Sequence, residues 1–229
     1  MDMTEETKKQ IREIISNCVN QALIRVKKNK SYKPFHEALL TRKLVNASAF
    51  ERSFSTSFGQ GPIEEISKII AISNGNNCER QKEIHISAYK GAIDEIDRIL
   101  SSLRSGETKP NWKRELQKIY AFNKGDTESK RLIFDLWIKK DHVEKFISIK
   151  TVKPNLDQTE IAKRNMLLLK AHDPKYEPYF ALYYNPGGEE KKDYNWSMPS
   201  KIFDMINDPC VLIGKDYWEI VGGKDTYKD

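Results

Sequence analysis

The segment from residue 131 to residue 151 constrains the fold most, because it holds two apolar runs on either side of a short charged stretch. The runs RLIFDLWI and KFISIKT have the composition of strands, and KKDHVE between them is typical of a turn, so the segment predicts a β-hairpin. Each run contains one charged residue in apolar surroundings, Asp135 in the first and Lys150 in the second. Burying a charge is costly unless it is paired or binds a ligand. The hairpin is therefore the first candidate for a functional site.

The other periodic segments predict an α/β fold with a mixed sheet. The expected helices are 4–27, one from Gly61-Pro62 to Asn74-Gly75, 89–104, 110–121 and 157–172, and the expected strands are 79–87, 131–138, 145–151 and 178–184. We expect one domain over residues 1–229, with a helical, basic part at 1–58 and a catalytic core at 59–229. Helix 4–27 either packs on this domain or pairs with a second copy. Asp157 and Glu160 have the spacing of a capping box.

Charge and cysteine usage limit the function classes. The net charge is +6, and residues 1–50 carry ten Lys/Arg against five acids, while residues 139–175 carry nine against five. Two basic segments are compatible with a polyanionic partner. The three cysteines and four histidines are scattered, which argues against structural zinc and suits a reducing compartment. The chain has no apolar h-region at its start and no apolar run of membrane-spanning length, so we expect a cytoplasmic protein without a membrane.

The hairpin carries residue types that metal-dependent phosphodiester hydrolysis needs. Such hydrolysis needs a hard cation held by oxygen atoms and a further positive charge near the phosphate. Ser148 and Lys150 lie on one strand face because side chains alternate, and Asp135 precedes Ser148 by 13 residues, as a hairpin allows. Asp135 and the carbonyl of Ile149 would hold the metal, and Lys150 would hold the water and phosphate. The same pattern also arises by chance in a chain with 31% charged residues, as an ordinary charged hairpin.

Several segments in order resemble TdeIII-like type II restriction endonucleases of the PD-(D/E)xK superfamily, over roughly residues 30–227. The segments that carry this resemblance are SFSTSFGQG with IEEISKIIA, FDLW with FISIKTVKPNLDQTEIAKR, FALYYNP, and KIFDMINDPCVLIGKDYW with IVGG. The resemblance implies an αβββαβ core with added helices. It also implies a Mg²⁺-dependent homodimer that cuts both strands of a short palindrome in double-stranded DNA, alongside a cognate DNA methyltransferase. Related enzymes are associated with the site GGNCC.

The sequence departs from the superfamily pattern at the position of the second acid, where Ser148 stands, and Phe134 stands where a proline often precedes the aspartate. Some relatives with such a serine recruit the acid from a helix, so Glu65 and Glu160 are the candidates. Helical spacing of 100° per residue puts Glu65 at the edge of the isoleucine stripe of its helix and Glu64 opposite, toward solvent. Glu160 is already assigned to the capping box, so we expect Glu65 to be a catalytic residue and metal ligand. Both Glu64 and Glu65 are also acids that a helix N-terminus favours.

Candidate DNA contacts lie in two segments after the hairpin. They are Lys153 and Asn155 just past the second strand, and Lys191, Lys192, Asn195 and Lys201 in the loop 185–201. The serines and threonine of SFSTS (53–57) are further candidates for phosphate contacts. Because the loop also holds two adjacent glutamates, a merely solvated loop is an equal alternative. Two other functions stay open: a catalytically impaired DNA-binding protein of this fold, which Ser148 favours, and a structure-specific repair nuclease.

Overall fold

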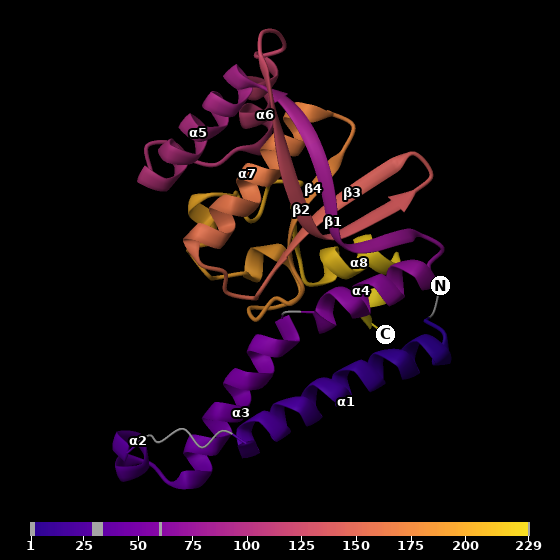
Figure 1. Ribbon diagram of the computed structural model, residues 1–229, viewed down its shortest axis with the longest axis vertical. Coiled ribbons are helices and arrows are strands. Elements are labelled where there is room, and N and C mark those ends of the chain that lie inside the picture. Colours follow the sequence, from indigo (N-terminus) through magenta and orange to yellow (C-terminus); the bar gives the residue numbers. More distant parts are fainter. Residues whose placement is uncertain (1–2, 29–33, 60, 229) are drawn as a thin grey trace.

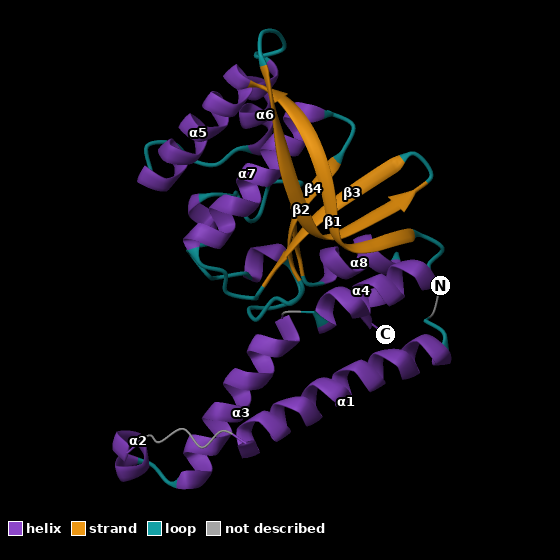
Figure 2. Ribbon diagram, in the orientation of Figure 1, coloured by secondary structure: helices purple, strands orange, loops and turns teal. Residues whose placement is uncertain are grey.

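A computed structural model describes residues 3–28, 34–59 and 61–228 of the chain (Figure 1). Its centre is a five-stranded mixed sheet with strand order β1-β2-β3-β4-β5, coloured orange in Figure 2. The strands are β1 (Asn77–Tyr89), β2 (Thr127–Lys140), β3 (Val143–Lys150), β4 (Glu177–Leu182) and β5 (Val211–Ile213). The first three strands pair antiparallel, and β3, β4 and β5 pair parallel. The prediction of a mixed α/β fold is confirmed.

Helices cover both faces of this sheet and give two apolar cores. The helices α4 (Pro62–Ser73) and α8 (Lys215–Gly222) cover one face and pack on Leu136 and Ile147. The other face is covered by α5 (Lys90–Ser105), α6 (Trp112–Tyr120) and α7 (Leu156–His172). The helix α4, three strands, α7 and β4 form the expected αβββαβ core, and α5 and α6 are the inserted helices. Three single-turn helices complete the chain: η1 (Lys191–Asp193), η2 (Pro199–Lys201) and η3 (Thr226–Lys228).

The N-terminal helices form an arm that projects from this core (Figure 1). The arm consists of α1 (Glu5–Lys28), α2 (Pro34–Leu39) and α3 (Arg42–Gly59). The helix α1 packs on both α3 and α4, as expected for a helix packed on the domain. At 1.5 Å per residue α1 is about 36 Å long, so only part of it can reach the core. Three large apolar side chains of the arm, Phe35, Leu39 and Leu44, are each more than half exposed.

The start of α7 differs from the prediction. Asn155 is the N-cap, and its side chain accepts a hydrogen bond from the backbone N–H of Gln158 at 2.8 Å. Glu160 instead forms an ion pair with Arg104 of α5 at 2.6 Å, and Asp157 pairs with the same guanidinium at 2.8 Å. The predicted capping box is therefore wrong. The helix begins earlier than expected because Asn155 is extended and a good cap, so Asp157 is already a helical residue.

A buried ion pair ties the inserted helices to α7. Lys163 is fully buried, and its Nζ lies 2.5 Å from Oε2 of Glu115 on α6. The same ammonium donates a hydrogen bond to the carbonyl of Ile202 at 3.1 Å and lies 4.5 Å from the ring centre of Phe203. The insertion, α7 and the segment around η2 are thus fixed to one another on the face of the sheet opposite α4.

Among the residues that the structure describes, no helix is both long enough and apolar enough to cross a membrane.

Candidate active site

Asp135 lies where the sheet divides into two. The pairing between β2 and β3 runs from Lys140 and Val143 to Leu136 and Ile147. Beyond that point β2 stays paired with β1 while β3 stays paired with β4 as far as Lys150. At this fork the backbone N–H of Ile149 points toward β2 without a strand partner there. It donates instead to Oδ2 of Asp135, at 2.7 Å.

The pleat of the β1–β2 ribbon reverses at the same position. Phe134 packs in the core under α5 and α7, whereas Leu136 packs in the core under α4 and α8, although regular alternation would give both the same face. The residue opposite Asp135 is Gln81, which has a positive φ of 50° and lies between the pairs Arg80–Leu136 and Lys82–Phe134. Asp135 therefore points sideways into the fork rather than into either core.

Lys150 meets Asp135 in the fork, as the sequence predicts. Its Nζ lies 3.0 Å from Oδ2 of Asp135 and donates a second hydrogen bond to the carbonyl of Ile149 at 3.1 Å. The side chains of Lys150 and Asp135 are 22% and 25% exposed, so both are shielded yet reachable from solvent. Ser148 lies on β3, two residues before Lys150, and is buried. An acid, a carbonyl oxygen and a cation thus converge at one point.

Of the two glutamates of α4, Glu65 lies at the partly exposed edge as predicted, but Glu64 does not face solvent. The side chain of Glu64 is 11% exposed and that of Glu65 is 37% exposed. Gln81 Nε2 donates to both carboxylate oxygens of Glu64, at 2.9 and 3.0 Å. The prediction that Glu64 faces solvent is wrong, because β1 covers that side of the helix in addition to the core under the isoleucines. Glu64 and Ser67 are therefore buried although they interrupt the apolar stripe.

Arg80 holds both glutamates of α4. Its Nε lies 3.3 Å from Oε2 of Glu64, and its Nη1 lies 2.5 Å from Oε2 of Glu65. Partial burial lowers the pKa of Arg80, but the hydrogen bonds to Glu65 and Glu64 outweigh it and raise the pKa overall.

Tyr217 of α8 is a buried phenol beside α4. It is fully buried and lies 2.5 Å from the hydroxyl of Ser67. Burial raises the pKa of Tyr217 most, the Ser67 hydrogen bond lowers it, and the carboxylates of Asp135 and Glu64 raise it further.

The donors around the fork suit a hard divalent cation. Asp135 uses only Oδ2 for its hydrogen bonds with described residues, so Oδ1 can bind a metal. The carboxylate of Glu64, which Gln81 opposite Asp135 holds, and the carbonyl of Ile149 are the candidate further oxygen donors. No group of three or more His, Cys, Asp or Glu side chains that could hold a metal occurs within residues 3–28, 34–59 and 61–228. One or two carboxylates with water and phosphate oxygens are what Mg²⁺ usually takes in proteins, so this donor set fits it.

Glu160 lies elsewhere. Its ion pair with Arg104 places it between α7 and α5, on the face of the sheet opposite α4. The structure therefore does not bring it to Asp135.

The candidate DNA contacts form one continuous surface beside the fork. The loop 185–201 packs on the segment after β3, since Tyr194 donates to the carbonyl of Val152 at 2.9 Å and Trp196 donates to that of Pro154 at 3.1 Å. Lys153 lies over the ring of Trp196, at 5.3 Å from its centre. The exposed members of this surface are Lys153, Asn155, Lys192, Asn195 and Lys201. Lys191 is half-buried, and its Nζ contacts Asp216 at 3.8 Å.

Ser53 and Ser57 of SFSTS lie on α3 and face α1, while Ser55 and Thr56 are exposed. Arg25 of α1 donates to the hydroxyl of Ser53 at 3.1 Å and to that of Ser57 at 2.8 Å. These hydroxyls therefore already accept hydrogen bonds within the arm.

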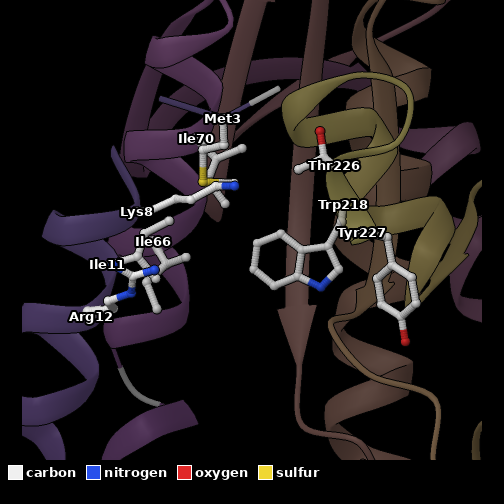
Figure 3. Close-up of a pocket in the computed structure, with 9 residues that line it drawn as sticks. All are labelled: Met3, Lys8, Ile11, Arg12, Ile66, Ile70, Trp218, Thr226 and Tyr227. Atoms are coloured by element: carbon white, nitrogen blue, oxygen red, sulfur yellow. The ribbon is translucent and has the colours of Figure 1, made fainter. Parts of the chain in front are cut away.

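A separate apolar pocket lies between α1, α4 and α8 (Figure 3). Its volume is about 300 Å³, and Ile66 and Ile70 line it on one side while Trp218 and Tyr227 line it on the other. None of Asp135, Ser148 and Lys150 lines it. The pocket marks the joint between the arm and the core, and it is distinct from the fork.

Three residues of the site were missed from the sequence: Glu64, Arg80 and Gln81. A helix wheel drawn for one buried face cannot find Glu64, because α4 is covered on two sides. Arg80 and Gln81 stand in the charged run ERQKE, which carries no sign of a function on its own. A signal for them is the pairing of this run in β1 with the part of β2 that carries Asp135.

Residues 3–229 match the family of HinfI type II restriction endonucleases. The chain belongs to this family. It is 27% identical over 219 residues to the type II restriction enzyme HgiCII of Herpetosiphon aurantiacus, covering 92% of this chain and 79% of that enzyme. HgiEI of the same organism is 28% identical with the same coverage, and MjaII of Methanocaldococcus jannaschii is 26% identical over 202 residues, covering 52% of that enzyme. No solved structure matches the chain.

Membership of the HinfI family makes this enzyme a site-specific deoxyribonuclease that acts on DNA. The predicted resemblance to type II restriction endonucleases is confirmed at this level. Family membership favours sequence-specific cleavage over the impaired-protein and repair-nuclease alternatives.

Proposed function

We propose that this HinfI-family enzyme hydrolyses both strands of a short palindromic DNA site with Mg²⁺, and that Asp135 and Lys150 carry the chemistry. The observation that supports this most is the meeting of Asp135, the Ile149 carbonyl and Lys150 at the fork of the sheet. The site GGNCC comes from the resemblance to related enzymes and is the first sequence to test. A cognate methyltransferase would protect the same site.

The proposed roles follow from the donors and the charges. Asp135, the Ile149 carbonyl and a second acid would hold Mg²⁺, which supplies an activated water and charge neutralisation when bound. Lys150 is held in place by its two hydrogen bonds, so its ammonium can donate to a phosphate oxygen without reorganising. Ser148, on the same strand as Lys150, is neutral and cannot be the second acid. That acid must therefore come from another element.

We assign the second acid to Glu64 rather than to the predicted Glu65. Glu64 is buried beside Gln81, which lies opposite Asp135, and its charge acts on the same phenol as that of Asp135. The side chain of Glu65 is more exposed, and among the described residues its hydrogen bond comes from Arg80. Glu65 stays the alternative, and substitution of each glutamate alone separates them.

The surface around the loop 185–201 is the proposed reader of the site. Lys153 and Asn155 follow the catalytic strand directly, so they would contact the DNA backbone near the cut. Lys192, Asn195 and Lys201 are exposed on the adjoining loop and would reach into the major groove. Lys191 makes internal contacts and is the weakest member of this set.

The enzyme is proposed to act as a homodimer through its arm. Cutting two strands of a palindrome is simplest with two sites related by a two-fold axis. The exposed side chains of Phe35, Leu39 and Leu44 favour the arm at 1–58, rather than the core at 59–229, as the part that a second copy covers.

Plasmid cleavage tests the proposed function. Purified enzyme is incubated with plasmid and Mg²⁺, with and without EDTA, and the ends of the products are sequenced. The expected result is one repeated palindrome at all ends and no cleavage with EDTA. Cleavage that persists in EDTA, or ends without a common sequence, would contradict the proposal.

A further inference from the structure

The acids near the fork are each held by a basic side chain. Lys150 holds Asp135, and Arg80 holds both Glu64 and Glu65. Arg80 thus occupies the carboxylate that the proposed function needs as a metal ligand. Lys150 has a role in the proposed reaction, whereas Arg80 has none in it.

We propose that Arg80 is a counter-ion that weakens metal binding at Glu64 in the free enzyme and moves to a DNA backbone phosphate when substrate binds. This inference rests on the proposed function, since it takes Glu64 as the second acid. Arg80 would be a positioning residue of the reaction. It couples the arrival of DNA to the arrival of the metal.

The contacts of Arg80 are those of a side chain that can exchange partners. It is 32% exposed, and among the described residues its side-chain hydrogen bonds go only to Glu64 and Glu65. Glu64 keeps its two hydrogen bonds from Gln81 when the guanidinium leaves, so the acid stays in place. An arginine binds phosphate through the same planar donors that it offers to carboxylates.

A depression beside Arg80 offers room for the phosphate. Its volume is about 400 Å³, and it lies between α1, the end of α3 and the start of α4. Arg80 and Arg25 both line it, together with Asn17, Gln21 and one acid, Glu65. Two arginines and two amides against one carboxylate favour an anionic group over a cation.

The coupling follows from charge. With Arg80 in place, a divalent ion at Glu64 meets a cation that already contacts the same carboxylate. One unit charge a few ångströms from a divalent ion, at an effective dielectric between that of a protein surface and water, changes affinity by at least about tenfold. By linkage, DNA that removes Arg80 strengthens metal binding, and metal strengthens DNA binding by the same factor.

The test is Mn²⁺ binding to the DNA-free enzyme, measured by titration calorimetry. Arg80→Gln should bind Mn²⁺ at least about tenfold more tightly than the wild type. Arg80→Lys keeps the charge and should stay within about twofold. Arg25→Gln is the matched control, because this arginine lines the same depression without touching Glu64. With DNA and Ca²⁺, the salt dependence of Arg80→Gln should fall by about one phosphate contact.

The outcomes separate the two proposals. If Asp135→Asn abolishes Mn²⁺ binding while Arg80→Gln and Arg80→Lys both bind like the wild type, the counter-ion inference is overturned and the metal site stands. If Asp135→Asn binds Mn²⁺ as well as the wild type, the metal site itself is wrong and both proposals fail. A thermal melt of each variant confirms that it is folded, and Arg80→Met replaces Arg80→Gln if the latter does not fold.

Discussion

The choice between Glu64 and Glu65 as second acid can be tested by two isosteric substitutions. Glu64→Gln keeps the shape of the side chain but removes its charge, so a metal held by Asp135 and Glu64 loses one of two carboxylates. Since even outer partners of a metal site cost 10–100-fold when lost, we expect the cleavage rate at fixed Mg²⁺ to fall by at least about 100-fold.

The matched change at the neighbouring position should do little. Glu65 forms a half-exposed ion pair with Arg80, and such pairs contribute about 0–1 kcal/mol. At most about 1 kcal/mol corresponds to a factor of roughly five, so Glu65→Gln should cleave within about fivefold of the wild-type rate. Glu160→Gln is a second control, because its partner Arg104 lies on the other face of the sheet.

Stability has to be measured alongside activity. Glu64→Gln removes the charge that strengthens the hydrogen bonds which the buried carboxylate accepts from Gln81 and Arg80, and such a bond to a charged group contributes about 1.5–3 kcal/mol. For a chain of this size that is a decrease in Tm of roughly 3–12 °C, so the variant should be folded at 25 °C. The assay is single-turnover plasmid cleavage over a series of Mg²⁺ concentrations, with a thermal melt of each variant.

The opposite result would refute the reasoning. If Glu65→Gln is inactive and Glu64→Gln cleaves normally, the acid is the one that the helical spacing predicts, and burial was a poor guide. If both variants are active, Asp135 is the only carboxylate that the metal needs.

Four further outcomes are expected. Lys150→Ala should lose about 10²–10³ in cleavage rate and keep DNA binding in a filter assay, and more than about a tenth of the wild-type rate would rule out its role. Phe35→Ser should leave Tm unchanged, because the side chain is exposed, and it should weaken the dimer on DNA in sedimentation. A wild-type complex with one chain per duplex would contradict the dimer. Lys163→Met leaves Glu115 unpaired and should cost about 3–5 kcal/mol in urea unfolding, and Glu115→Leu in the same chain should restore much of it. Burial raises the pKa of the Cys78 thiol from 9.0 to about 12, so the unfolded chain loses this proton at a lower pH than the folded protein. The stability of the fold should therefore fall as pH rises from 9 toward 12. Cys78→Ala should lessen that decline in thermal melts.

The hairpin and its two charged residues were predictable because the information is local. Alternation along a strand puts Ser148 and Lys150 on one face, and a short turn brings the strand with Asp135 beside them. Helix limits were predicted closely wherever a stripe of apolar residues had a clear end, as at Pro62 and Asn74.

The second acid was not predictable, because its position depends on elements distant in sequence. Glu64 is buried by Gln81 and Arg80, which belong to β1, and the sequence does not say which side of α4 that strand covers. The reversal of the pleat at Asp135 is equally non-local, since it appears only when the neighbouring residues pack into two different cores. The capping box at Asp157 and Glu160 was predicted wrongly for a simpler reason: Asn155 is as good a cap as Asp157 and comes first along the chain.

The fork of the sheet has a consequence for the synthesis of the enzyme. Asp135 belongs to the half of the sheet built by β1 and β2, and Lys150 belongs to the half in which β3 pairs with β4. The proposed catalytic pair therefore needs β4, which starts at Glu177, 27 residues after Lys150. A nascent chain that has made only the hairpin holds both residues but lacks the partner strand that fixes the second one. We expect a ribosome-bound chain stalled before β4 to be unable to cut DNA, so that nuclease activity arises late in synthesis.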